Sequence, residues 1–142
     1  MATLDMDNII SGILEMPISK IFSKLGEGHF RHLEYELCQG LDSLENTVIA
    51  TGGGIVLDER NITALRRYAT IFYLKASPQK LAANLEGDET RPLLPQDGRL
   101  AAITTLLAQR EHLYQAASDF IVETDALNPV KIAQMVAKLY EV

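Results

Sequence analysis

The sequence has only one cysteine, Cys38, and no apolar run long enough to span a membrane. A single cysteine cannot form an internal disulfide, which favours a reducing compartment and predicts a cytoplasmic location. The N-terminus lacks the basic and then apolar pattern of a signal peptide, so neither export nor membrane association is predicted. Cys38 falls in a helix-like segment, and we interpret it as a buried structural thiol rather than a catalytic one.

Basic residues are outnumbered, with 13 Lys and Arg against 19 Asp and Glu, for a formal net charge of −6. This balance argues against a nucleic-acid partner, which would require a basic patch. An anionic ligand would not be attracted by the overall field either. Any anion site must therefore be built locally, from a few arginines and backbone N–H groups.

The chain has 142 residues, 47% of them hydrophobic, which suits one domain of residues 1–142 with a real core. Short apolar runs predict parallel strands that are buried on both faces, and they alternate with helix-like stretches in an α/β layered fold. The expected strands are 47–51, 70–74, 120–123 and a stub at 2–4; the expected helices are 27–44, 58–68, one from Ser77-Pro78, 98–117, and one from Asn128-Pro129 to about 140. Residues 86–97 are polar and rich in turn formers, which predicts an exposed, mobile loop.

Three consecutive glycines, residues 52–54, directly follow the strand expected at 47–51. Glycine is costly in a strand because it loses much backbone entropy and offers no side chain to pack. Three together favour a backbone that something approaches closely, at the carboxyl end of a strand where bare N–H groups can hold a polar ligand. A plain tight turn is the alternative.

Asp5 and Asp7 stand two residues apart after the first stub. If the strand continues through them, both carboxylates point to one side, where they can hold a cation or position a hydroxyl. The alternative is that Asp7 caps a helix that starts at residues 8–10.

Three arginines are candidates for anion binding. Arg31 and Glu34 are three apart on a predicted helix, so they can pair, although such pairs are usually solvated. Arg110 shares a helix stripe with apolar residues and so needs an internal or ligand carboxylate as partner. Arg91, on the polar loop, could contact a phosphate on loop closure or could be simply solvated. The three histidines form no metal-ligand pattern.

Taken in order, five segments resemble those of the shikimate kinase family. They are residues 5–7 (DMD), 26–34 (GEGHFRHLE), 51–54 (TGGG), 91–94 (RPLL) and 109–114 (QREHLY). The resemblance runs from about Leu4 to the C-terminus, and the combination is specific although no single motif is. It implies a P-loop-kinase-like parallel sheet with helices on both faces.

The resemblance also implies an activity and site residues. Shikimate kinases use ATP and Mg²⁺ to phosphorylate the 3-hydroxyl of shikimate, a step of aromatic amino-acid biosynthesis. Asp7 matches the aspartate that binds the shikimate hydroxyls and acts as base, and Asp5 matches one near Mg²⁺. Arg31 and Arg110 match the arginines that bind the shikimate carboxylate, and Glu34 matches a glutamate that supports this site. Gly53 and Gly54 match glycines whose backbone lines the same pocket. Arg91 matches the arginine of a lid, residues 86–98, that reaches the transferring phosphate.

One segment of the family's pattern has no match in these residues. The family has a strand and a G-x-x-x-x-G-K-[ST] loop before its Asp-x-Asp pair, and this pattern occurs nowhere in the 142 residues. The family's sheet without this first, central strand would forfeit roughly 10 kcal/mol of burial, at about 2 kcal/mol per side chain, against a typical stability of about 5–15 kcal/mol. We therefore expect closure of the gap, a homodimer or strand-donating partner, or a fragment of a longer protein.

Three hypotheses follow: a shikimate kinase whose activity in these 142 residues alone is doubtful, a relative that binds shikimate without phosphorylating it, and an interaction module. Only the first requires ATP and Mg²⁺.

Overall fold

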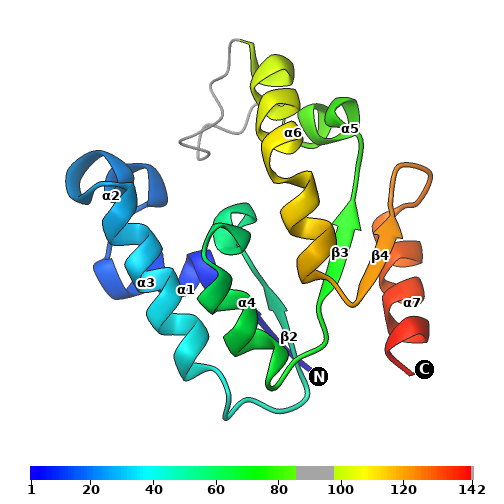
Figure 1. Ribbon diagram of the computed structural model, residues 1–142, viewed down its shortest axis with the longest axis horizontal. Coiled ribbons are helices and arrows are strands. Elements are labelled where there is room, and N and C mark those ends of the chain that lie inside the picture. Colours follow the sequence, from blue (N-terminus) through cyan, green and yellow to red (C-terminus); the bar gives the residue numbers. More distant parts are fainter. Residues whose placement is uncertain (86–97, 142) are drawn as a thin grey trace. The chain divides into compact units, whose positions relative to one another are not determined.

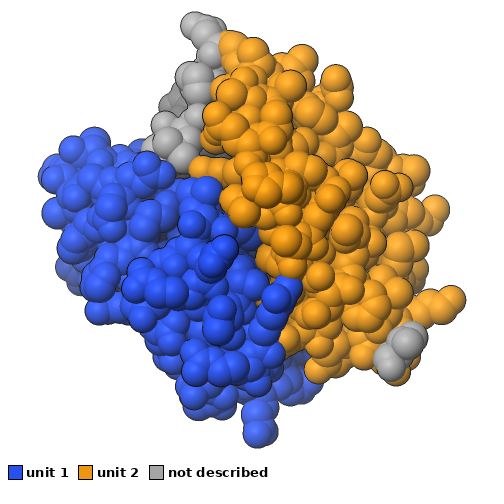
Figure 2. Space-filling view, viewed as in Figure 1, with its two compact units in different colours: residues 1–68, 89–93 blue, residues 69–88, 94–142 orange. Residues whose placement is uncertain are grey.

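A computed structural model describes residues 1–85 and 98–141, which fold as an α/β protein with parallel strands. Two compact units divide the described residues (Figure 2): unit 1 holds residues 1–68, and unit 2 holds residues 69–85 and 98–141. The predicted loop at 86–97, with Arg91, lies outside the described residues.

Unit 1 consists of a two-stranded parallel sheet and helices that follow each strand (Figure 1). Strand β1 pairs with β2 in a register that runs from Ala2 opposite Thr47 to Asp5 opposite Ala50. The elements are β1 (Ala2–Asp5), α1 (Met6–Leu14), α2 (Ile18–Leu25), α3 (Glu27–Gly40), β2 (Thr47–Ala50), a 3₁₀ turn η1 (Gly53–Leu57) and α4 (Glu59–Arg66).

The core of unit 1 is mainly helical. Ile10 of α1, Ile21 of α2 and Phe30 of α3 are each at most 3% exposed and form one cluster. Gly26 separates α2 from α3 with φ of +87°, a left-handed conformation that favours glycine. This turn folds α2 back on α3 and fixes Glu27 as the first residue of α3.

Unit 2 carries the second two-stranded parallel sheet, in which Phe72–Lys75 of β3 lie opposite Phe120–Glu123 of β4. The rings of Phe72 and Phe120 stack with centroids 5.2 Å apart. The elements are β3 (Phe72–Lys75), α5 (Pro78–Asn84), α6 (Arg99–Ala117), β4 (Phe120–Glu123) and α7 (Pro129–Tyr140). Ser77 and Asn128 cap α5 and α7 and each precedes a proline in the first helical turn, as the sequence predicts.

The predicted α/β class and parallel strand pairing are confirmed, but two details were wrong. The strands are not buried on both faces: Val48 of β2 is 52% exposed and Leu74 of β3 is 50% exposed. Each strand has only one partner in its sheet, so side chains at the unpaired edges lack lateral cover. Helix α2 was also not predicted, and a helix in the place of α1 was expected only as the alternative for Asp7.

None of the described helices combines the length and the apolar character needed to cross a membrane.

A side-chain hydrogen bond from Asn61 links α4 to η1. Asn61 is 1% exposed, and its Nδ2 donates to the backbone oxygen of Ile55 at 3.1 Å. This bond holds η1, the turn that includes Gly53 and Gly54. We predict that Asn61→Ala lowers the free energy of unfolding by about 1–2 kcal/mol, because a buried carbonyl loses its donor. Urea denaturation measures the change. Thr63→Ala, on an exposed part of the same helix, should stay within about 0.5 kcal/mol of the parent chain, and an equal loss in both variants would contradict this role of Asn61.

Candidate functional site

The glycine run lies where β2 gives way to η1. None of the three glycines has a positive φ, so backbone conformation does not explain them. Close packing does. Gly54 is buried, and a Cβ built on it would collide with the guanidinium of Arg31. The predicted close approach is therefore present, and the group that approaches Gly54 is the protein's own Arg31.

Arg31 is held at both ends of its guanidinium by residues of α3. Its Nη1 donates to Glu34 Oε1 at 3.2 Å and to Oε2 at 3.4 Å, and its Nη2 donates to Glu27 Oε1 at 3.3 Å. The Glu34 side chain is 2% exposed and that of Arg31 is 22% exposed. The pair predicted at i and i+3 forms, but it is largely buried rather than a solvated surface pair.

Two aromatic rings flank this arginine. The guanidinium carbon of Arg31 lies 5.3 Å from the ring centroid of Phe30 and 5.9 Å from that of Phe22. Both distances are within the range of cation–π attraction. The rings restrict where the guanidinium can move, so Arg31 is a preorganised cation at the edge of unit 1.

Asp7 belongs to the same cluster. A Cβ built on Gly52 would lie 3.0 Å from Asp7 Oδ1 and 3.6 Å from Glu34 Oε2. Gly52 thus lets two carboxylates approach the backbone after β2. The structure brings Asp7, Glu34 and Arg31 together around the glycines, at the carboxyl ends of β1 and β2, where parallel sheets usually bind ligands.

Asp5 and Asp7 do not extend from one strand, because β1 ends at Asp5 and α1 begins at Met6. Asp5, and not Asp7, is the N-cap of α1: its Oδ1 accepts from the backbone N–H of Asn8 at 3.2 Å. Both expectations for this pair were therefore wrong in detail. The helix starts between the two residues and turns Asp7 toward the glycines.

The other predicted site residues lie elsewhere. Arg110 is half-buried on α6, in unit 2, and Arg91 lies outside the described residues. Gly53 is the first residue of η1. Among the described residues, no group of three His, Cys, Asp or Glu side chains could hold a metal ion.

Cys38 is buried in α3, as predicted. Burial, with a smaller contribution from the charge of Glu34, raises the pKa of its thiol to about 12. The thiol is therefore protonated at neutral pH and is a poor nucleophile. This supports a structural role for Cys38.

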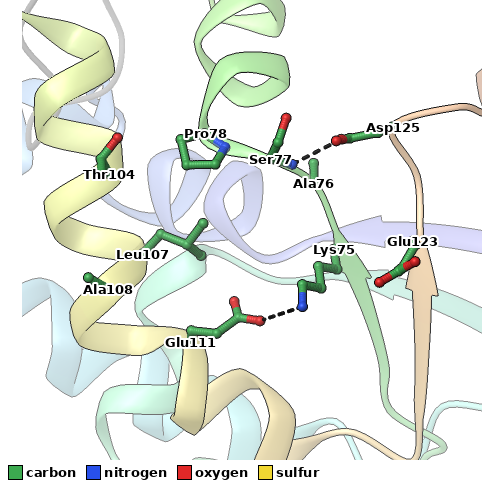
Figure 3. A pocket seen from close by; sticks show the side chains of 10 residues that line it. All are labelled: Lys75, Ala76, Ser77, Pro78, Thr104, Leu107, Ala108, Glu111, Glu123 and Asp125. Atoms are coloured by element: carbon green, nitrogen blue, oxygen red, sulfur yellow. Dashed lines mark hydrogen bonds and ion pairs between the residues drawn. The ribbon is translucent and has the colours of Figure 1, made fainter.

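A cavity of about 490 Å³ lies within unit 2, at the carboxyl ends of β3 and β4 and beside α6 (Figure 3). No predicted site residue lines it. Its lining residues are Lys75, Ala76, Ser77, Pro78, Thr104, Leu107, Ala108, Glu111, Glu123 and Asp125.

The charged groups of this cavity are mostly acidic. Lys75 Nζ is bound by Glu111 Oε1 at 3.2 Å, and the Tyr73 hydroxyl also donates to Glu111. Burial opposes the ionisation of Glu111, but the bonds from Tyr73 and Lys75 outweigh it and lower the pKa of Glu111. The cavity is thus lined by three carboxylates and by one ammonium that is already paired, so it is poorly suited to an anionic phosphate.

Sequence reasoning missed one member of the cluster. Glu27 precedes Arg31 by four residues, the spacing at which an acid and a base pair on a helix. The sequence already predicts a helix that begins at Glu27, and the structure confirms that start, so this spacing could have indicated the pair.

Comparisons of the sequence and of the structure with known proteins agree on the same family. A family model described as shikimate kinase matches residues 1–141. The chain is 38% identical to a shikimate kinase of Thermodesulfovibrio yellowstonii over 97% of this chain and 79% of the relative, and 38% identical to one of Xylella fastidiosa over 95% and 76%. Among solved structures, shikimate kinase from Acinetobacter baumannii in complex with shikimate has a TM-score of 0.92 at 29% identity, covering 98% of this chain and 78% of that one.

Gly54 offers a direct test of the cluster. We predict that Gly54→Ala displaces the Arg31 guanidinium from Glu34 and lowers the free energy of unfolding by about 1–3 kcal/mol. Urea denaturation gives the energy, and the NMR signal of the Arg31 Nε–H reports the displacement. Gly28→Ala is the control, because a Cβ there meets nothing within 4 Å. Equal stability of the two variants would show that Gly54 is not required for close packing.

Proposed function

The chain belongs to the shikimate kinase family, and we propose that it binds shikimate and serves the ATP-dependent phosphorylation of the shikimate 3-hydroxyl. One observation carries the proposal: the guanidinium of Arg31 is fixed by buried Glu34 and packed on Gly54, with Asp7 beside Gly52. A fixed planar cation next to a carboxylate suits a ligand that combines a carboxylate with hydroxyl groups.

The proposed roles follow the chemistry of each group. Arg31 and Arg110 bind the carboxylate of shikimate, and Glu34 keeps Arg31 in place. Asp7 accepts hydrogen bonds from the ring hydroxyls and takes up the proton of the reacting one. Gly53 and Gly54 line this pocket with backbone alone. An aspartate acting as base toward a substrate hydroxyl is a common part of phosphoryl transfer.

The described residues do not form a complete site for Mg²⁺ or for the phosphates of ATP. Asp5, the proposed neighbour of Mg²⁺, is already engaged as a helix cap. The cradle of backbone N–H groups, its lysine and its hydroxyl would come from a G-x-x-x-x-G-K-[ST] pattern that the 142 residues do not contain. ATP supplies the transferred phosphoryl group in this family, and Arg91 is proposed to approach that group.

A second candidate is a catalytically inactive shikimate-binding or interaction module. The observation that favours it is the pair of two-stranded sheets, in which every strand has an unpaired edge. An isolated pair of strands is marginal without further cover. A homodimer or a strand-donating partner would supply the missing neighbour. Nucleic acid and membrane remain unexpected partners, and a cytoplasmic location stays a prediction.

We predict that the 142-residue chain binds shikimate but turns over ATP at a small fraction of the rate of the shikimate kinases to which it is similar. Loss of one transition-state donor costs about 2.7–4 kcal/mol, a factor of 10²–10³ in rate, and here several donors are missing. A coupled assay with ATP and shikimate measures turnover, and calorimetry measures binding of each ligand. Near-normal turnover would refute the prediction, and tight binding of Mg²⁺-ATP would refute the binding-module alternative.

We further predict that Arg110→Ala abolishes shikimate binding in calorimetry, because the carboxylate loses one of its two cationic partners. Arg67→Ala is the matched control. It removes the same charge from an exposed position directly after α4, where the described side-chain hydrogen bond is the one to Gln39 at 3.4 Å. Unchanged affinity in Arg110→Ala would mean that the carboxylate binds elsewhere.

A further inference from the structure

Glu27 holds the outer end of the Arg31 guanidinium. Its Oε1 accepts from Nη2 at 3.3 Å, while Glu34 occupies Nη1. Glu27 is the first residue of α3 and follows the left-handed turn at Gly26. Two carboxylates of one helix therefore compete with any ligand for the same guanidinium.

The two carboxylates differ in how easily they can leave. The side chain of Glu34 is 2% exposed, whereas that of Glu27 is 48% exposed. Removing Glu34 from Arg31 would leave a buried charge without this partner, which is costly. Glu27 can instead rotate into water, because an exposed pair at i and i+4 is weak. Glu27 is thus the replaceable partner of Arg31.

Arg31 also has a donor that Glu27 does not satisfy. Its Nε is buried and has no hydrogen-bond acceptor among the described residues. Nε and Nη2 point along the same edge of the guanidinium, the edge that a carboxylate binds with two parallel bonds. Glu27 takes only one of these two donors. A ligand carboxylate in its place could take both.

The local charge gives this exchange a consequence for affinity. Glu27 and Glu34 both bind the guanidinium, and the Asp7 carboxylate lies with that of Glu34 beside Gly52. A ligand carboxylate that joined them while Glu27 stayed bound would be repelled. Departure of Glu27 from Arg31 lowers that repulsion and frees Nη2.

We propose that Glu27 is a positioning residue that occupies, in the empty protein, the place on Arg31 that the substrate's carboxylate takes. Glu27 keeps the arginine paired and oriented without substrate, and shikimate displaces it on binding. Glu27 therefore weakens the affinity for shikimate. This inference rests on the proposed function, because it assumes that the ligand carboxylate binds Arg31.

Calorimetry with shikimate on the full 142-residue chain tests the proposal. Glu27→Gln should bind shikimate about 2- to 5-fold more tightly than the parent chain, the gain expected when a weak exposed pair no longer has to be broken. Glu36→Gln is the control. It removes the same charge from the same helix, at a side chain that is 60% exposed and pairs with His32 instead of Arg31. Its affinity should stay within about 1.5-fold of the parent.

A second readout follows the exchange itself. On titration with shikimate, the NMR signal of the Glu27 carboxyl carbon should shift as it leaves Arg31, while that of Glu36 stays in place. Unchanged or weaker binding by Glu27→Gln, or an equal gain in Glu36→Gln, overturns the role of Glu27 and leaves shikimate binding by the parent chain intact. If no variant and no parent chain binds shikimate, the proposed function fails, and this inference fails with it.

Discussion

The ion pair between Arg31 and Glu34, packed against Gly54, is the constraint on which the rest of unit 1 depends. A buried glutamate requires a cation at hydrogen-bond distance, and a guanidinium that lies on the backbone requires a residue without Cβ. Helix α3 must then pass the end of β2 at the position that places Arg31 against Gly54. The turn at Gly26 and the bond from Asn61 to Ile55 fix the two sides of that contact.

Carboxylates outnumber cations both around Arg31 in unit 1 and around the cavity of unit 2, and the two places balance them differently. In unit 1, Arg31 is shared by Glu34 and Glu27, and the aromatic rings of Phe22 and Phe30 keep it from leaving. In unit 2, Glu111 is matched by Lys75 and by the Tyr73 hydroxyl, which leaves no described cation of that cavity free for an anion. With a net charge of −6, an anionic substrate depends on single arginines. Local geometry around Arg31 then controls affinity more than the overall field does.

Much of the fold could be predicted from local signals. The strand at 120–123 and the caps Ser77 and Asn128 follow directly from residue type. The site was harder, because spacing shows that Arg31 and Glu34 can meet but not that Glu34 is buried. Its burial depends on Gly52 and Gly54 arriving from another part of the chain. The same reason hides the role of Asp7, since the start of α1 at Met6 is fixed by the cap at Asp5 and not by the alternation of a strand.

Each two-stranded sheet leaves an unpaired edge on both of its strands. Two paired strands bury too little to be stable alone, so the cover must come from helices. In unit 1, α1, α2 and α3 pack on one another through Ile10, Ile21 and Phe30, and α3 also carries Arg31. The strands of unit 2 depend more on each other, through the stacked rings of Phe72 and Phe120, while Leu74 is left half-exposed. The cluster around Arg31 is therefore built on α3, a helix of this core, and on the glycines that follow β2.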